Sequence, residues 1–368
     1  MTPRRTRTAT VLSLLGGFLF SGCGPEFQPM SSIETLRVLA VQKDRPYAAP
    51  GDEVTLTMLW ADGSEESGRP VEVAWITGCI NPLGDLYAGC FATGGTPMLA
   101  SGDQVSFTIP PDIITSRPPP QDPKQPRYGL SYVFFAVCAG TLELATGSAD
   151  FPLRCVDADG DPLGSSDFVA GYSAIYVYDD FGNNNPIVRG LSLDGKPLPN
   201  GCVDPGSAAA AVSDDLGALL GRAAHAAGPP EADEPPVVCD EHFPLDPLEQ
   251  PDCSLPNAPC VPPLPPGMFT RPSLEIRPEV YRSSIEADEI SKVAYDRDYE
   301  EQMWINYFAT RGGMLSDVRL LNDATTGFND DFETLFFPPA EPGPVTLWAV
   351  VHDNRGGVAW ARGTLWVQ

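Results

Sequence analysis

Residues 345–351, VTLWAVV, and residues 358–367, VAWARGTLWV, are two apolar runs rich in β-branched and aromatic side chains. Between them, residues 353–357 read DNRGG, the polar and glycine residues typical of a tight turn. Two such runs joined by such a turn predict a β-hairpin, because glycine supplies the positive φ angles that the turn requires. The last part of the chain is therefore expected to form an antiparallel sheet.

Short segments with a period of two residues recur along most of the chain. Residues 130–138, LSYVFFAVC, place one apolar set on each face of a strand. Short strands separated by turn signals are typical of antiparallel sandwiches, so the expected fold class is mainly β, with two immunoglobulin-like sandwich domains. The other expected strands are 35–42, 54–60, 71–77, 105–109, 142–146, 173–178, 187–193, 273–277 and 302–308.

The strands fall into two groups, which predicts an N-terminal sandwich at 33–182 and a C-terminal one at 183–368. A proline- and cysteine-rich insertion at about 203–272 interrupts the second group. It begins with one short amphipathic helix, for which Ser213 is the expected N-cap. Residues 110–126 contain seven prolines and are expected to form an exposed loop, because proline cannot pair inside a sheet.

The chain is strongly acidic, with 49 acidic and 23 basic residues and a formal net charge of −26 at pH 7. Proteins bind nucleic acids by neutralising phosphates with lysine and arginine, so no nucleic-acid partner is expected. The plain interpretation of the acidity is a soluble, self-repelling surface. The sharper interpretation is cation binding.

The N-terminus resembles the signal peptide of a bacterial lipoprotein, covering residues 1–22. Three arginines precede an apolar run at 9–20, and the run is followed by LFSGC at 19–23, which resembles a lipobox. The run is shorter than the ~20 residues that cross a bilayer. The resemblance implies that Cys23 carries the lipid and that 23–32 is a tether, with the outer membrane as destination. An ordinary cleaved secretory signal and a short transmembrane anchor are the alternatives.

Eight further cysteines follow Cys23, and an even number in an exported protein indicates disulfides. They allow 105 connectivities. The shortest loops favour Cys79–Cys90 and Cys253–Cys260, and Cys138–Cys155 and Cys202–Cys239 would complete the set. A metal site is less compatible with the sequence, which has no C-x-x-C pair and 3 histidines. The disulfide candidates are Cys79, Cys90, Cys138, Cys155, Cys202, Cys239, Cys253 and Cys260.

Two sets of motifs carry a resemblance to a family. One is VLAV at 38–41, APGD at 49–52 and Trp75 shortly before Cys79. The other is the segment LWAVVHDNRGGVAW at 347–360. Together they resemble cell-surface lipoproteins of myxobacterial type, which are built of immunoglobulin-like or PKD-like sandwiches. The resemblance implies the fold and the cell envelope, and it brings no activity with it.

Three acidic loops are candidates for calcium, which binds six to eight oxygen atoms. In the first, Asp157, Asp159 and Asp161 occupy alternate positions, although the residues that an EF-hand loop requires are missing. The second is the turn beginning at Asp353, and the third is residues 329–331, NDD. A solvated turn is the plainer interpretation of each loop. No other cofactor is expected.

Two further kinds of chemistry can be compared with the sequence. Trp304, Trp348, Trp360 and Trp366 could stack on sugar rings, although alternating strands usually bury such residues in a core. A hydrolase would need a nucleophile, a base and an orienting acid, and the sequence contains no G-x-S-x-G motif.

The sequence thus predicts a lipid-anchored envelope protein that acts as a non-enzymatic binding or scaffolding module, with a protein or glycan partner besides the membrane. A calcium-dependent or carbohydrate-binding adhesion module is the alternative, and a divergent enzyme is the third hypothesis. A deep pocket holding a histidine beside serine or aspartate would favour the enzyme.

Overall fold

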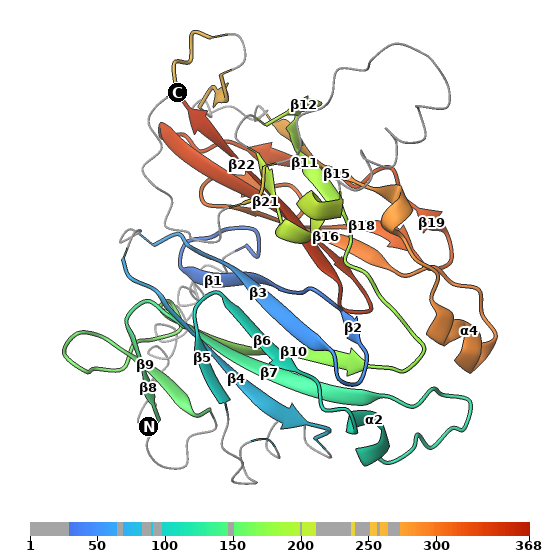
Figure 1. Ribbon diagram of the computed structural model, residues 1–368. Coiled ribbons are helices and arrows are strands. Elements are labelled where there is room, and N and C mark those ends of the chain that lie inside the picture. Colours follow the sequence, from blue (N-terminus) through green and yellow to red (C-terminus); the bar gives the residue numbers. More distant parts are fainter. Residues whose placement is uncertain are drawn as a thin grey trace, which may run out of the picture.

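The computed structural model describes residues 29–64, 69–82, 90, 98–145, 151–198, 201–210, 237–239, 251–255, 258–263 and 273–368. Strands dominate these ranges and form two β-sandwiches, one above the other in Figure 1. The mainly β sandwich fold predicted from the sequence is confirmed. Cys23 and the signal segment lie outside the described residues. Within the described ranges, no helix has the length and apolar character needed to cross a bilayer.

The first sandwich pairs a three-stranded sheet with a five-stranded one. Its core lies between them and includes Leu56, Trp75 and Phe135. The three-stranded sheet has the order β1 (Leu36–Lys43), β3 (Glu53–Asp62) and β6 (Gln104–Thr108). The facing sheet has the order β2 (Tyr47–Ala48), β10 (Phe168–Val177), β7 (Gly129–Cys138), β4 (Glu72–Ile80) and β5 (Met98–Ser101).

Two small elements complete the first sandwich. A hairpin of β8 (Thr141–Leu144) and β9 (Leu153–Val156) follows β7. Helix α2 (Ile113–Ser116) lies inside the proline-rich stretch, and its residues Ile113 and Ile114 are buried in the core. The expectation that 110–126 is wholly exposed is therefore wrong at these two residues, whose apolar side chains outweigh the local proline signal.

The second sandwich is built around the predicted C-terminal hairpin, β21 (Gly343–Asp353) and β22 (Val358–Val367). Its larger sheet also contains β13 (Cys202–Val203), β14 (Cys260–Val261), β16 (Met303–Ala309), β18 (Val318–Asp323) and β19 (Gly327–Phe328). The facing sheet has the order β12 (Lys196–Pro197), β11 (Val188–Leu193), β15 (Leu274–Val280), β20 (Thr334–Phe337) and β17 (Gly313–Met314). A 3-10 turn (Arg282–Ser284) and helix α4 (Glu289–Tyr295) connect β15 to β16.

A third apolar layer joins the two sandwiches, and we call it the junction. Leu39 and Ala40 of β1 and Leu59 of β3 belong to the same buried cluster as Trp348 of β21 and Trp360 of β22. The four sheets therefore stack face to face, with the sheet of β1 and the sheet of β21 in the middle (Figure 1). Both middle sheets are apolar on their two faces.

Buried hydrogen bonds cross the junction beside this layer. The side-chain amide of Gln42 donates to the Val358 carbonyl and to Asp204 Oδ1, both at 2.7 Å. Asn185 donates to the Lys43 carbonyl at 2.6 Å and accepts from the Val358 amide at 2.9 Å. These bonds fix how one sandwich meets the other.

The segment just before β1 also pairs with the second sandwich. Ser32 forms a parallel bridge with Ala309, and the Ile33 amide donates to the Ala309 carbonyl at 2.9 Å. Ser31 is 3% exposed and Ile33 is fully buried. The described end of the predicted tether is therefore held against β16.

A helical segment precedes the position of the predicted helix. Residues 205–210 are helical, and Asp204 Oδ1 accepts a hydrogen bond from the Ser207 amide at 3.0 Å, as an N-cap does. Pro205 follows it at the first helical position, where its missing N–H costs nothing. The predicted N-cap Ser213, like most of the insertion, lies outside the described residues.

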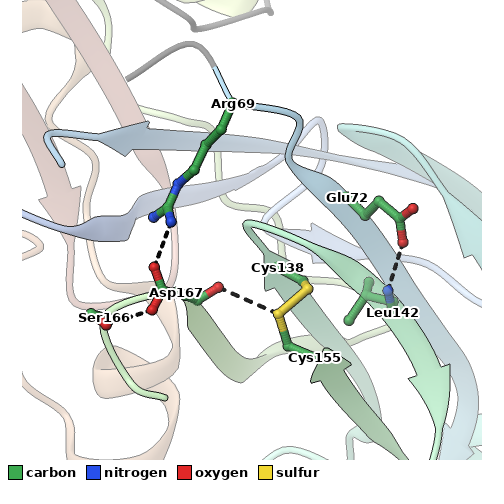
Figure 2. The surroundings of a disulfide bond; sticks show 7 residues. All are labelled: Arg69, Glu72, Cys138, Leu142, Cys155, Ser166 and Asp167. Carbon is green, nitrogen blue, oxygen red and sulfur yellow. Dashed lines mark hydrogen bonds and ion pairs between the residues drawn. A yellow bond between two sulfur atoms is a disulfide. The ribbon is translucent and has the colours of Figure 1, made fainter. Parts of the chain in front are cut away.

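Four disulfides are present: Cys79–Cys90 and Cys253–Cys260, which the short loops favoured, and the two completing pairs Cys138–Cys155 and Cys202–Cys239. Figure 2 shows the Cys138–Cys155 bridge, which ties the end of β7 to β9. Beside it, Arg69 forms ion pairs with Asp167 at 2.6 Å and with Asp62 at 2.8 Å. This corner of the first sandwich is thus held by covalent and ionic links together.

Candidate functional site

A cleft of about 600 Å³ opens along the junction, where β1, β10 and the β21–β22 turn meet. We call it the junction cleft. Its volume lies within the range of small-ligand sites. Both sandwiches contribute to its lining, which includes Lys43, Tyr47, Tyr172, Tyr176, Trp304 and His352.

Tyrosine rings form the wall that the first sandwich contributes. Tyr172 and Tyr176 lie four residues apart on one face of β10, beyond the apolar core of the sandwich. Tyr176 contacts Tyr47 and Tyr128, with ring centroids 6.3 and 5.7 Å apart, and Tyr172 contacts Tyr132 at 5.2 Å. Tyr172 is 42% exposed and Tyr176 is 39% exposed. The rings are thus held in place while keeping accessible faces.

The second sandwich contributes a stacked pair of rings. Trp304 of β16 and His352 of β21 are cross-strand partners, and their rings are 5.3 Å apart and nearly parallel at 14°. Burial lowers the pKa of His352 to about 4, so the imidazole is neutral at pH 7. The pair offers the cleft a flat, uncharged surface.

Lys43 brings a cation into the cleft. It is the last residue of β1, only 4% of its surface is exposed, and its ammonium donates to the Ala174 carbonyl at 3.0 Å. Burial lowers its pKa to about 8, and the charge of nearby Asp353 partly opposes this. Within the described ranges, no carboxylate lies close enough to pair with this ammonium.

The β21–β22 turn forms the rim on the other side. Asp353 Oδ1 accepts from the amides of Arg355 and Gly357, each at 2.7 Å, and Asp353 Oδ2 accepts from Asn183 at 3.1 Å. A Cβ atom at position 357 would lie 2.1 Å from Asp353 Oδ2, so only glycine fits there. The carboxylate of Asp353, one of the predicted cation ligands, is therefore occupied in closing its own turn.

A buried ionic network fixes this turn to the rest of the second sandwich. The Arg355 guanidinium contacts Glu301 at 2.7 Å and Glu286 at 2.6 Å. The side chain of Arg355 is 5% exposed and that of Glu301 is 1% exposed. Glu301 also accepts from the Glu286 amide at 3.0 Å. The rim of the cleft is therefore rigid.

The cleft brings His352 near Asp353 and Ser173, the combination that would favour an enzyme. However, Asp353 is engaged with its own turn, and His352 stacks on Trp304. Among the residues that the structure describes, no hydrogen bond joins His352 to Asp353 or to Ser173. This arrangement lacks the linked nucleophile, base and acid that acyl transfer requires.

The acidic loops do not gather into a metal site in the described part of the chain, where no group of three or more such ligands occurs. Asp157 Oδ1 accepts from the amides of Asp159 and Asp161, each at 2.9 Å. Asp331 donates its amide to Asn329 and pairs with Arg319 at 3.1 Å. These carboxylates stabilise turns and one surface ion pair.

The four tryptophans proposed for sugar stacking separate into different environments. Trp348 and Trp360 are buried in the junction, at 0% and 3% exposure. Trp366 is partly buried near the end of β22. Trp304 lines the cleft, so it is the one of the four that the structure places at a candidate binding surface.

A larger groove of about 850 Å³ runs beside β5. Its polar groups already have partners within the protein. Trp60 donates to Asp103 at 2.9 Å, Glu72 accepts from the Leu142 amide at 2.7 Å, and Arg69 forms the ion pairs described above. The junction cleft, with its buried ammonium, is therefore the better candidate site.

Sequence reasoning missed Lys43, Tyr172 and Tyr176. Lys43 stands at the end of an apolar strand, where a lysine ordinarily marks the solvent edge. The available signal was that Gln42 and Lys43 extend the strand pattern instead of breaking it. The alternation of Tyr172, Ala174 and Tyr176 was visible too, but nothing in it indicates what the outer face of β10 meets.

Comparisons with known proteins give only distant likenesses. No protein-family profile and no curated protein matches the chain. Among solved structures, the fibronectin(III)-like modules of Clostridium thermocellum CbhA are similar over 89% of this chain and 94% of theirs, at 8% identity and a TM-score of 0.17.

Two bacterial macroglobulins are similar over 93% of this chain. They are the Escherichia coli alpha-2-macroglobulin activated by porcine elastase, at 10% identity and a TM-score of 0.18, and a Salmonella alpha-2-macroglobulin, at 12% and 0.18. The chain spans 22% and 17% of their lengths. At such TM-scores the likenesses carry no functional argument, so the function is argued from the cleft.

Proposed function

We propose that this protein is a non-enzymatic binding module of the bacterial cell envelope, anchored by lipid at Cys23, and that the junction cleft is its binding site. The observation that carries the proposal is a cleft of about 600 Å³ with exposed aromatic rings and rigid walls from two sandwiches. Such preorganised walls reduce the entropy that binding would otherwise cost.

The arrangement of the N-terminus supports anchoring close to the membrane. Ser31 is held against β16 and stands eight residues after Cys23. A fully extended chain spans at most ~3.5 Å per residue, so Ser31 stays within about 28 Å of the anchored residue. Four disulfides suit the oxidising side of a bacterial membrane.

A carbohydrate is the class of ligand that we favour for the cleft. Half-exposed tyrosine rings and the Trp304–His352 stack present flat apolar faces, and the tyrosine hydroxyls supply polar edges. Sugar rings have one apolar face and a polar rim, so they match this lining. The alternative hypothesis of an adhesion module therefore gains support in its carbohydrate-binding form, without a need for calcium.

Cys23→Ala is expected to abolish incorporation of radiolabelled palmitate and to release the protein from envelope membranes. The reason is that Cys23 supplies the only attachment point in the proposal, and lipid chains supply the membrane affinity. Cys253→Ala is the matched control, since it removes a different cysteine and should leave labelling unchanged. Label that survives in Cys23→Ala would contradict the anchoring.

The binding site can be tested by photo-cross-linking in cells. In one variant, a photoreactive phenylalanine analogue replaces Tyr172 at the cleft. In the control variant, the analogue replaces Val318 on β18, which has a similar exposure of 43% and does not line the cleft. An envelope component should become attached at position 172 and not at 318. Equal attachment at both positions, or none at 172, would remove the cleft as the binding site.

A further inference from the structure

Lys43 is unusual among the lysines of this chain. The sequence contains four, and Lys124, Lys196 and Lys292 are all exposed. Lys43 alone is buried, with 4% of its surface accessible. A buried ammonium is costly unless an anion and hydrogen bonds compensate for the lost water. The buried ammonium of Lys43 therefore requires a compensating group.

The protein itself supplies little compensation. The ammonium has three donors, and one of them binds the Ala174 carbonyl at 3.0 Å. Asp353 is the nearest acidic group acting on it, but its carboxylate already accepts bonds from Arg355, Gly357 and Asn183. The lowered pKa of Lys43, about 8, agrees with a cation that is desolvated more than it is paired.

The ammonium lies at the edge of the cleft, beside the β21–β22 turn. Lys43 is among the residues that line the cleft. Gly356, on the opposite rim, has a φ of 93°, and a Cβ atom there would lie 2.7 Å from Lys43 Nζ, so only glycine leaves room for the ammonium at this place. Within the described residues, two of the three donors of Lys43 have no hydrogen-bond partner, and a ligand in the cleft could supply one.

From this geometry we infer that the junction cleft binds an acidic saccharide, whose carboxylate pairs with Lys43 while its rings stack on the aromatic walls. This rests on the proposed function and specifies its ligand. A carboxylate completes the unused donors of Lys43. The aromatic walls are Tyr172 and Tyr176 from the first sandwich and the Trp304–His352 stack from the second.

The other titratable groups around the cleft do not replace this role. His352 is neutral at pH 7 because burial lowers its pKa to about 4. Burial raises the pKa of Tyr47, which stays neutral as well. Arg355 is saturated by Glu286 and Glu301. Lys43 is therefore the cation in the cleft that a ligand's carboxylate can neutralise.

The test compares two probes with the same sugar backbone, digalacturonate and its uncharged methyl ester, in calorimetric titrations of the full chain. Digalacturonate should bind at pH 7 at least tenfold more tightly than the ester. Lys43→Met should remove this difference, because a charge-assisted hydrogen bond is lost and only ring stacking remains. Lys196→Met changes the net charge equally at an exposed site and should bind both probes like the wild type.

A second measurement needs no variant, which matters should Lys43→Met fail to fold. In the wild type, the affinity for digalacturonate should decline above about pH 8, as the free ammonium loses its proton. The affinity for the ester should stay constant over the same range. Binding of the acid stabilises the charged form and so raises the pKa of Lys43 in the complex.

Equal affinity for the two probes, or an affinity for digalacturonate that survives in Lys43→Met, would overturn the inference. If benzoate, a carboxylate without a sugar ring, binds as tightly as digalacturonate, the saccharide assignment would be overturned. If photo-cross-linking at position 172 succeeds while digalacturonate fails, the ligand inference falls and the proposed function stands. If cross-linking at position 172 fails, the proposed function falls with it.

Discussion

Trp348→Ala is expected to lower the free energy of unfolding by about 3–5 kcal/mol, the range for removing a fully buried tryptophan. Trp348 is completely buried, and its side chain lies in the junction with Leu39 and Leu59 of the first sandwich. Loss of the indole leaves a cavity between two sheets that cannot collapse freely, because buried hydrogen bonds hold the sandwiches at a fixed spacing. Urea denaturation followed by circular dichroism measures the loss.

Trp366→Ala is the matched control for this prediction. Trp366 is only partly buried and lies outside the junction cluster. Its removal should therefore lower the free energy of unfolding by less than half as much as Trp348→Ala. A loss below about 1 kcal/mol for Trp348→Ala, or equal losses for both variants, would show that the junction contributes little to stability.

Arg355→Met is expected to destabilise the fold by a comparable amount, about 3–5 kcal/mol, because the buried Glu301 carboxyl group loses its cation and two hydrogen bonds. Glu301 is 1% exposed and accepts from Arg355 Nη2 at 2.7 Å and from Nε at 3.1 Å. Without the guanidinium, the Glu301 carboxylate keeps one hydrogen bond, from the backbone amide of Glu286 at 3.0 Å. The free energy of unfolding, measured by urea denaturation, should fall accordingly.

The loss of stability in Arg355→Met should depend on pH, because Glu301 titrates. Burial raises the pKa of Glu301 to about 7 even beside Arg355, and removal of the cation raises it further. The folded variant then keeps its proton at pH values where the folded wild type is ionised. The penalty should therefore grow as the pH rises above about 7 and shrink toward pH 5.

The double variant Arg355→Met/Glu301→Gln provides the control. It removes both charges and keeps a side chain of similar shape, so it should recover most of the lost stability. A double variant as unstable as the single one would mean that Arg355 acts through packing alone.

The elements of this fold were largely readable from the sequence. Alternation in 130–138 and the turn at 353–357 predicted β7 and the C-terminal hairpin, because side chains in a strand alternate between faces. The short strands β5, β9, β18 and β20 were missed. They have four to six residues each and little alternation, so their pairing depends on neighbours that are distant in sequence.

The site could not be predicted in the same way. The run VTLWAVV at 345–351 has almost no polar residues, which indicates a strand buried on both faces. It does not indicate which surface covers the second face. That surface is β1 and β3, and the bond from Gln42 to Val358 joins residues 316 positions apart. Lys43 and Tyr172 become a site only once this contact exists.

The junction has a consequence for the order in which the chain is made. The apolar outer face of β1 and β3 includes residues 39, 40, 59 and 61, whereas most of the residues that cover it come from 348–360. Some 290 residues must therefore be synthesised after this surface before its cover exists. Until then the N-terminal half exposes an apolar patch, so fragments that lack the C-terminal hairpin should aggregate.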